Sequence, residues 1–324
     1  MLAGGEFSMN SDIATSAAYA HRPVLLAEVI EGLSIRPSGI YVDATFGRGG
    51  HAQALLQRLD AQGVLLAIDK DPEAVAAARK MFADDARFSI EQGTFAMLEH
   101  YVQERGWKGR VDGVLLDLGV SSPQLDDPLR GFSFRHDGPL DMRMNPQSGM
   151  SAAQWLANAK EAEIISVLRN YGEERYAPRI ARALIAARNE SPLTTTRQLA
   201  TIVAAANPAW EPGKDPATRT FQAIRIFINR ELEDVEACLP QALEALAPGG
   251  RLAVISFHSL EDRIVKRYMR DEARGDRFPV GVPVLATQLQ PRVRLVGKAI
   301  HAGTQELSEN PRARSAVLRI AEKI

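Results

Sequence analysis

The feature that most constrains this chain is the stretch of residues 40–52, in which a short apolar run leads into a cluster of glycines. The run carries β-branched residues and has the length of a buried parallel strand. Gly47, Gly49 and Gly50 allow a tight turn, and leucines at helical spacing follow over residues 51–59. Strand, glycine turn and helix form the opening unit of a nucleotide-binding α/β domain, where backbone N–H groups face the ligand.

A second apolar run supports this prediction. Residues 64–68 have the composition of a strand and lead directly to Asp69, which lies twenty residues after Gly49. An acid at this offset is placed to bind both ribose hydroxyls of an adenosine.

Further apolar runs alternate with helical patterns and predict the rest of the sheet. Runs of strand length occupy residues 87–91, 111–116 and 248–256. Their alternation with helices predicts a doubly wound, Rossmann-like α/β fold with a parallel sheet. The last run, residues 315–320, alternates apolar and polar side chains and predicts an edge or antiparallel strand.

Residues 130–230 break this pattern, because they contain several helical patterns and no convincing strand. The sequence therefore predicts an α/β domain made of residues 21–129 and 231–324, with an inserted all-helical domain between the two parts. Residues 1–20 are small and polar, and we expect them to be disordered.

Basic residues are concentrated in two parts of a chain whose net charge is −1. Residues 130–230 hold fourteen basic and nine acidic side chains, and residues 260–324 hold thirteen and eight. Within the insert, a helix predicted over residues 173–188 places three arginines on one face: Arg175, Arg179 and Arg182. This distribution suits a protein that meets a polyanion with one side, although ordinary solvated faces explain the charges equally well.

The composition limits the class of protein. A hydrophobic content of 45% and a charged content of 24% are typical of a soluble globular protein. The single cysteine, Cys238, excludes an internal disulfide and fits a reducing compartment. No apolar run is long enough to span a membrane, and the start of the chain lacks a secretory signal. We therefore expect a cytoplasmic protein without a membrane partner.

The residues that follow the strands are the candidates for a site, because open α/β sheets bind ligands beyond the carboxyl ends of their strands. Asp117 ends the fourth strand, where it either caps the next turn or faces a substrate. Phe95 follows the third strand and either stacks on an adenine or packs in the core. His51 either caps a helix or faces solvent.

Candidates for substrate binding lie farther along the chain. Ser121 and Ser122 shape a turn that brings carbonyl and hydroxyl oxygens close to Asp117. Beyond them, Phe132 lies in a segment rich in arginine, which either stacks a base and holds phosphates or anchors the loop to the core. His258 is either a substrate contact or a structural histidine. No Cys/His cluster has the spacing of a metal site.

Nine motifs resemble those of a single family. One of them is Asp43-Ala-Thr-Phe-Gly-Arg-Gly-Gly-His51, and the complete set lies at residues 21–26, 43–51, 116–126, 130–134, 138–144, 171–175, 216–222, 255–266 and 310–315. By these motifs, in this order, the chain is identified as a member of the bacterial RsmH (MraW) family of S-adenosylmethionine-dependent 16S rRNA cytosine-N4 methyltransferases. The resemblance covers the chain from about His21 to its end.

The resemblance implies a class I methyltransferase sheet, with S-adenosyl-L-methionine as the cofactor. It implies methylation of N4 of a cytidine in the decoding region of 16S rRNA, at position 1402 in the usual rRNA numbering. The implied partner is 16S rRNA in the small (30S) ribosomal subunit or a late precursor of it. The sequence leaves a homodimer open.

The resemblance also implies the roles of individual residues. The cofactor positions carried over from the family are Gly49, Gly50, His51, Asp69, Phe95, Asp117 and Gln124. We expect Asp117 either to accept a hydrogen bond from the N4 amine or to hold the cofactor while the neighbouring turn contacts the amine. The candidates for RNA contact are Ser121, Ser122, Phe132, Arg175, Arg179, Arg182 and His258.

Two positions depart from the patterns that we would expect. Many amino-methyltransferases have an Asp/Asn/Ser-Pro-Pro-aromatic sequence after the fourth strand, where this chain has Asp117-Leu-Gly-Val120. Asp215 occupies a position where related proteins often have histidine, which leaves the role of that side chain open.

Two other functions are compatible with parts of the sequence. The glycine turn and Asp69 also satisfy the dinucleotide fingerprint, so an NAD-dependent oxidoreductase is one alternative, although no general acid/base and hydride-acceptor site can be recognised. The other alternative is a non-catalytic RNA-binding assembly factor, and the intact cofactor turn argues against it.

Overall fold

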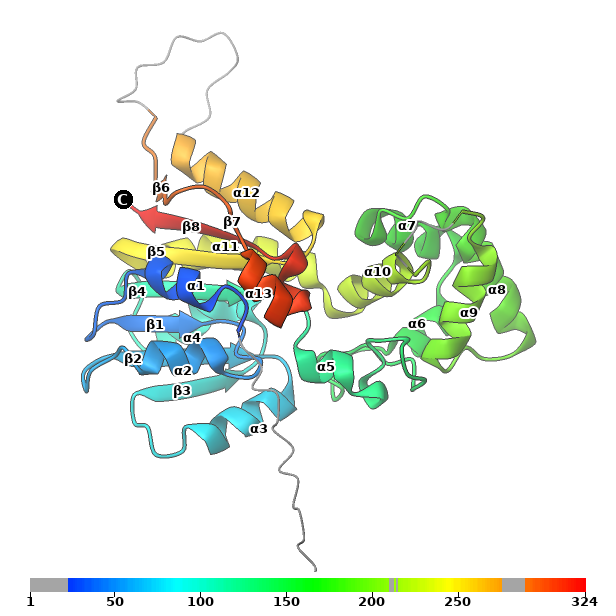
Figure 1. The fold of residues 1–324 in the computed structure, drawn as a ribbon, viewed down its shortest axis with the longest axis horizontal. Helices are drawn as coiled ribbons and strands as arrows, with labels where there is room; N and C mark the ends of the chain where they lie inside the picture. The colour runs from blue at the N-terminus through cyan, green and yellow to red at the C-terminus, as the bar shows by residue number, and fades with distance from the viewer. Residues whose placement is uncertain (1–22, 210–212, 214, 276–288) are drawn as a thin grey trace, which may run out of the picture.

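The computed structural model describes residues 23–209, 213, 215–275 and 289–324. The segment 1–20, which we expected to be disordered, lies outside the described residues. The described chain forms two lobes (Figure 1): a sheet with helices on both faces, and a second lobe built of helices.

The first lobe contains an eight-stranded sheet in the order β3-β2-β1-β4-β5-β8-β6, with β7 beside β8. The strands are β1 (Ile40–Asp43), β2 (Val64–Asp69), β3 (Phe88–Gln92), β4 (Val111–Asp117), β5 (Leu246–Ser256), β6 (Val293–Leu295), β7 (Ile300–His301) and β8 (Val317–Lys323). Strands β1 to β5 are parallel, and β8 runs antiparallel to its neighbours. The doubly wound α/β prediction is therefore confirmed. The last strand is antiparallel and is not at the edge, because β5 and β6 flank it.

Alternation along the strands explains why helices cover both faces of this sheet. Tyr41 and Val42 are neighbours in β1, yet they belong to two different apolar clusters on opposite faces. On the Tyr41 face lie α1 (Leu26–Leu33), α2 (Gly50–Leu56) and α3 (Pro72–Met81). On the Val42 face lie α4 (Leu98–Glu104), α11 (Glu231–Ala245) and α12 (Ser259–Arg274). Strands buried on both faces need the nearly continuous apolar runs seen in the sequence.

The second lobe has an apolar core of its own. Its helices are α6 (Ala152–Asn158), α7 (Glu161–Gly172), α8 (Ala177–Glu190), α9 (Thr196–Ala206) and α10 (Thr218–Asn229). Trp155, Leu168, Leu184 and Ile224 are among the buried side chains that join these helices. Because α8 begins at Ala177, the helix predicted over residues 173–188 starts four residues late, after a turn at Glu173 in the left-handed region.

The two lobes are joined tightly at Asn229. Its side-chain amide donates to the Met142 carbonyl at 2.7 Å and its Oδ1 accepts from the Met144 N–H at 2.7 Å. Its backbone carbonyl accepts from Lys70 Nζ in the sheet lobe at 2.8 Å. Arg230 then turns the chain with a φ of 53°, which ends α10 and begins α11. Buried amide groups with this many partners fix the relative position of the segments that they join.

In the described part of the chain, no helix combines the length and apolarity required to cross a lipid bilayer.

Candidate functional site

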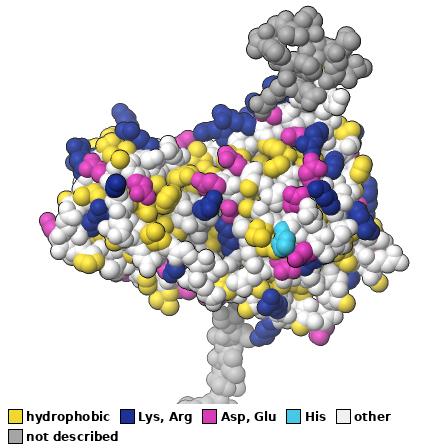
Figure 2. All heavy atoms as spheres, turned by 180° about the vertical axis from the view of Figure 1, so that it is seen from behind, with side chains coloured by type: hydrophobic (Ala, Val, Ile, Leu, Met, Phe, Trp, Pro, Cys, Tyr) yellow, Lys and Arg dark blue, Asp and Glu magenta, His cyan; other side chains and the backbone are white. Residues whose placement is uncertain are grey.

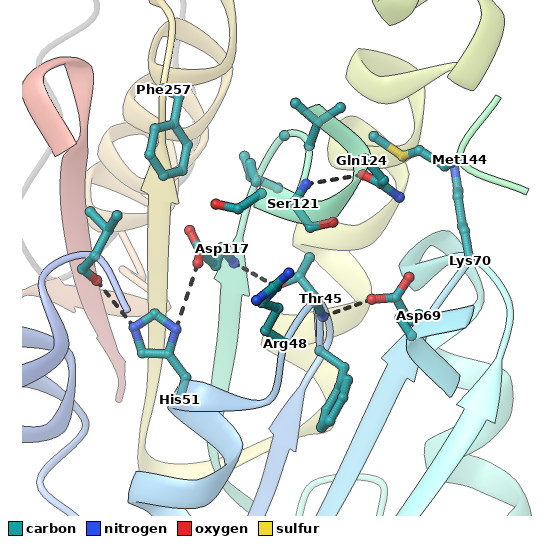
Figure 3. A pocket seen from close by; sticks show the side chains of 18 of the residues that line it. Thr45, Arg48, His51, Asp69, Lys70, Asp117, Ser121, Gln124, Met144 and Phe257 are labelled. Atoms are coloured by element: carbon teal, nitrogen blue, oxygen red, sulfur yellow. Dashed lines mark hydrogen bonds and ion pairs between the residues drawn. The ribbon is translucent and has the colours of Figure 1, made fainter. Parts of the chain in front are cut away.

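A pocket of about 600 Å³ opens at the carboxyl ends of the parallel strands, where the strand order reverses between β1 and β4. This is the place at which doubly wound sheets bind their ligands. Its walls come from the glycine turn after β1, from Asp69 after β2 and from the turn that follows Asp117 in β4 (Figure 3). Met144 and Arg225 also line it, so the second lobe and the segment leading to it close one side.

The glycine turn forms the floor of the pocket. Gly47 and Gly49 have φ angles of 55° and 76°, a region that favours glycine. A Cβ on Gly49 would lie 2.5 Å from Cζ of Phe46, which means that this position has no room for a side chain. Gly50 and His51 line the pocket, whereas Gly49 contributes to the shape of the turn without lining it. The turn thus presents backbone to a ligand, as the sequence predicts.

Asp69 lies at one end of the pocket, and its carboxylate is well supported. Oδ2 accepts from the Gly47 N–H and Oδ1 accepts from the Asp71 N–H, both at 2.8 Å. Burial raises the pKa of Asp69 to about 6, against the opposing effect of these two donors and of Lys70. The Lys70 ammonium lies 6.0 Å from the centre of the Phe95 ring, and Phe95 is a half-buried wall of the same end. Asp69 and Phe95 are therefore brought together, as expected for an adenosine site.

Asp117 lies at the other end of the pocket and has fewer hydrogen-bond partners than Asp69. Its Oδ1 is buried and has no hydrogen-bond partner among the described residues, and its Oδ2 lies 3.6 Å from Nδ1 of His51 (Figure 3). Burial raises the pKa of Asp117 to about 8, and the nearby Asp43 and Glu261 carboxylates add to this effect. A buried acceptor without a donor costs about 1–3 kcal/mol, so this oxygen is suited to a donor supplied by a ligand.

Asp43 is a second buried acid beneath the pocket. It ends β1 and is 1% exposed, and its Oδ1 accepts from the Thr45 N–H at 3.2 Å. Its Oδ2 has no partner among the described residues. Burial raises the pKa of Asp43 to about 7, with a further contribution from Asp69. Thr45 connects the two acids, because its hydroxyl accepts from the Asp117 N–H at 2.6 Å.

The turn after Asp117 is held by a capping box. Ser121 and Gln124 cap α5 (Ser122–Asp126), and the Gln124 Oε1 accepts from the Ser121 N–H at 3.0 Å. The Gln124 amide then donates to Oδ2 of Asp71 at 2.8 Å, and Arg130 donates to the same oxygen at 2.8 Å. Gln124, Ser121 and Ser122 all line the pocket. This network fixes the turn against the start of α3.

Phe132 and the three arginines lie outside the pocket. Phe132 is 5% exposed and packs in the core of the helical lobe, so the structure favours its role as an anchor of the loop. Arg179 and Arg182 lie on α8 and are exposed. Arg175 is exposed too, but it precedes α8 and lies over the Tyr176 ring at 5.6 Å. The prediction that all three arginines lie on one helix is therefore wrong for Arg175.

His258 belongs to a buried network of charges beside the pocket. Its ring caps α12, and Nε2 lies 3.0 Å from Oε1 of Glu261. Burial alone would raise the pKa of Glu261. Its contacts with His258, Arg225 and the Phe257 N–H outweigh burial and hold that pKa below its usual value. Oxygen and nitrogen atoms of Glu231, His258 and Glu261 lie within 4.8 Å of one another, as in a metal site. Arg225 already pairs with both oxygens of Glu231 at 2.9 and 2.8 Å, so we assign this cluster as an ion-pair network.

Three pocket residues could not be identified from the sequence. Phe257 follows β5 and its ring lies in the pocket near the turn after Asp117 (Figure 3). His258 does not line the pocket and pairs with Glu261. Met144 and Arg225 reach the pocket from segments far away in sequence. The only available signal was the position of Phe257 directly after a strand, because strand ends meet at one edge of the sheet.

Comparisons with known proteins identify the family of the chain. The sequence profile of the MraW methylase family matches residues 18–324. A protein named Ribosomal RNA small subunit methyltransferase H from Coxiella burnetii (strain RSA 331 / Henzerling II) is 59% identical over 305 residues, which cover 94% of this chain and 99% of that protein. A protein of the same name from Thioalkalivibrio sulfidiphilus is 60% identical over 308 residues, covering 95% and 98%.

Solved structures are more distant. A structure described as SMU.1697c, a putative methyltransferase from Streptococcus mutans in complex with SAH, is 11% identical, with a TM-score of 0.44 over 94% of this chain and 100% of that one. The assignment of a family therefore depends on the sequence relatives.

Proposed function

The chain belongs to the MraW methylase family and is an S-adenosylmethionine-dependent methyltransferase of small-subunit ribosomal RNA, and on that premise we propose that it methylates the N4 amine of a cytidine, C1402 of 16S rRNA. The observation on which this proposal depends most is Oδ1 of Asp117, which is buried and has no hydrogen-bond partner among the residues that the structure describes. A buried carboxyl oxygen beside a nucleotide pocket is suited to accept a hydrogen bond from an exocyclic amine. The proposal names the target atom, which the family alone leaves open.

The residues of the pocket fit S-adenosylmethionine. We propose that Asp69 binds the ribose hydroxyls, that Phe95 packs on the adenine and that Gly50, in the turn that Gly49 shapes, borders the methionine part. Gly49 has to be glycine for the turn to form, because a Cβ there would collide with Phe46. When bound, this molecule supplies an electrophilic methyl group on a sulfonium.

The opposite side of the pocket is suited to the base that receives the methyl group. We propose that a cytosine taken out of the RNA stack enters between Phe257 and the turn after Asp117. A ring placed there can stack on Phe257, and its N4 amine lies within reach of Asp117 and of oxygens in the turn.

The proposed role of Asp117 follows from the chemistry of the amine. The N4 lone pair is conjugated with the cytosine ring and is therefore a poor nucleophile. A hydrogen bond from N4–H to Asp117 favours a tetrahedral nitrogen and stabilises the positive charge that develops on it. Holding the amine in line with the methyl group supplies most of the remaining rate enhancement. If Asp117 instead holds the cofactor, the oxygens of the turn take over this role.

We propose that residues 130–230 form the domain that meets the RNA, with Arg179 and Arg182 on α8 and Arg175 beside it as contacts to phosphates. All three are exposed and make no ion pair with another described residue. On the face drawn in Figure 2, basic side chains are spread over both lobes and are interspersed with acidic ones.

The decisive experiment has two steps. Calorimetry with S-adenosylmethionine and with NAD measures the cofactor preference, and micromolar affinity for the first alone is expected. Small subunits lacking the modification are then incubated with the protein and labelled cofactor, and the rRNA nucleosides are analysed by mass spectrometry. N4-methylcytidine at the proposed position supports the proposal. Label at a ring carbon or on another base contradicts it.

The two alternatives considered from the sequence are not supported. An NAD-dependent oxidoreductase and a non-catalytic assembly factor both conflict with membership of a methylase family that matches nearly the whole chain.

A further inference from the structure

Arg225 belongs to α10 of the helical lobe, yet its side chain lines the pocket of the sheet lobe. The left-handed turn at Arg230 ends α10 and begins α11, and it brings Glu231 beside the guanidinium. Nε of Arg225 donates to Oε1 of Glu231 at 2.9 Å, and Nη2 donates to Oε2 at 2.8 Å. The two side chains are 16% and 7% exposed. A bidentate pair with so little exposure fixes the orientation of the guanidinium.

This ion pair leaves one nitrogen of the guanidinium for a ligand. A guanidinium has N–H groups on all of its nitrogens and can only donate. Nε and Nη2 of Arg225 are engaged by Glu231, whereas Nη1 makes no hydrogen bond to any residue that the structure describes. Because Arg225 lines the pocket, Nη1 is a fixed donor that is available to an acceptor entering there.

The neighbours of Arg225 place this donor on the side of the pocket that we propose for the base. Glu261 is 1% exposed and also lines the pocket, and its Oε2 accepts from the Phe257 N–H at 2.8 Å. The same carboxylate acts electrostatically on Arg225. It also adds to the effect of burial in raising the pKa of Asp117. Arg225, Phe257 and Asp117 are therefore grouped around Glu261.

The charges around Arg225 favour a neutral acceptor over an anion. Burial alone would lower the pKa of Arg225, but the Glu231 and Glu261 carboxylates outweigh burial and raise it, so the guanidinium stays charged. Its charge is already matched by Glu231, which binds it with both oxygens, and Glu261 adds a second carboxylate nearby. An anionic ligand therefore gains little at this place, whereas a neutral carbonyl oxygen can still accept from Nη1.

We infer that Nη1 of Arg225 donates a hydrogen bond to the O2 carbonyl of the target cytosine while the N4 amine meets Asp117. This inference rests on the proposed function. N4 and O2 lie at the two ends of one edge of the base, so the two contacts hold the ring in a single orientation. Adenine also has an amine on that edge but no carbonyl group, and it would leave Nη1 without an acceptor. Arg225 thus contributes to the specificity for cytosine.

A double-mutant cycle between the protein and the base tests this contact. Small subunits are reconstituted with 16S rRNA that carries either cytidine or 2-thiocytidine at the target position. Sulfur in place of O2 is a weaker acceptor, and the N4 amine is retained. Arg225→Lys keeps a cation beside Glu231 but loses the second arm of the guanidinium. Arg219→Lys is the matched control, because Arg219 lies on the same helix and does not line the pocket.

With cytidine, we expect single-turnover methylation by Arg225→Lys to be slower by about 10- to 100-fold, and its Kd for S-adenosylmethionine to stay within about threefold of the wild type. In the wild type, 2-thiocytidine should slow the reaction by about 10-fold or more, and in Arg225→Lys it should cause almost no further loss, because the hydrogen bond is already absent. Arg219→Lys should respond to 2-thiocytidine as the wild type does. A merely structural role of Arg225 would slow both substrates by the same factor.

Several results would overturn the inference. Equal slowing by 2-thiocytidine in the wild type and in Arg225→Lys would show that O2 does not contact Arg225. A large loss of cofactor affinity in Arg225→Lys, with a normal rate at saturating cofactor, would assign the guanidinium to the carboxylate of S-adenosylmethionine. If melting curves show that Arg225→Lys is unfolded, the wild type decides alone, and an unchanged rate on 2-thiocytidine contradicts the contact. Failure of the wild type to form N4-methylcytidine on the cytidine subunit would instead contradict the proposed function, before any variant or analogue is compared.

Discussion

The two ends of the pocket carry an aspartate each, and the two differ in what the protein provides for them. Asp69 has a backbone N–H on each oxygen, whereas Asp117 has one oxygen with no partner in the described part of the chain and the other facing His51 at 3.6 Å. Both follow parallel strands and both have raised pKa values. The satisfied acid is suited to hold a ligand in place, and the unsatisfied acid is suited to take part in chemistry. Strand-end position alone would not distinguish them.

The largest effect is expected from a substitution at Asp117. Asp117→Asn keeps the shape and removes the ability to accept a proton, so we expect kcat for rRNA methylation to fall by about 100-fold or more. Cofactor affinity should change by less than about threefold in calorimetry. A large loss of cofactor binding instead would assign Asp117 to the cofactor and leave the amine to the turn.

Asp69 should show the opposite pattern. Asp69→Ala removes the acceptor for the Gly47 and Asp71 N–H groups and the proposed ribose contact. A cost of about 1–3 kcal/mol corresponds to a Kd for S-adenosylmethionine that is roughly 10- to 100-fold weaker. At saturating cofactor the methylation rate should be nearly normal. Asp84→Ala, in the exposed turn after α3, is the matched control and should leave both quantities unchanged.

Asp43 extends the comparison to the pH dependence of folding stability. Its pKa of about 7 in the folded protein lies above the usual 3.8, so the folded state retains a proton that the unfolded chain has lost between these values. Folding stability should therefore decrease as pH rises from about 4 to about 7, and Asp117 extends this decrease to about pH 8. Asp43→Asn can still accept from the Thr45 N–H and does not titrate.

Chemical denaturation at pH 5 and pH 8 measures this effect. We expect the loss of unfolding free energy between the two pH values to be smaller in Asp43→Asn than in the wild type, by about 2–3 kcal/mol. An equal loss in both proteins would mean that Asp43 is ionised in the folded protein and that, of these two acids, only Asp117 has a raised pKa.

The smallest effect is expected outside the pocket. Arg179→Glu on α8 should weaken binding to the small subunit by a few fold and reduce the slope of log affinity against log salt by about 1, with cofactor affinity unchanged. Arg79→Glu on α3 is the control in the sheet lobe, because this side chain is also exposed. Equal effects of the two substitutions would remove α8 from the proposed interface.

The sheet lobe could be predicted from sequence because its signals are local. An apolar run of strand length, a glycine turn and an acid at a fixed offset each depend on neighbouring residues, and Asp69 and Phe95 were placed together on this basis. The start of α8 was predicted too early, since residues 173–176 have a helical pattern but the chain turns at Glu173 with a φ of 48°. The packing of the helical lobe determines that turn, and no local sequence pattern predicts it.

The amino-acid sequence by itself determined the α/β order of the elements, the position of the nucleotide turn and the family to which the chain belongs. Only the tertiary structure decided which polar atoms are left without partners. Asp117 and Asp69 have the same position at strand ends and both are approached from the glycine turn after β1, but Gly47 donates to Asp69 at 2.8 Å, whereas Nδ1 of His51 lies 3.6 Å from Asp117. Periodicity describes which face of an element is buried, and it contains no information on the distance between atoms that meet only when the sheet has formed.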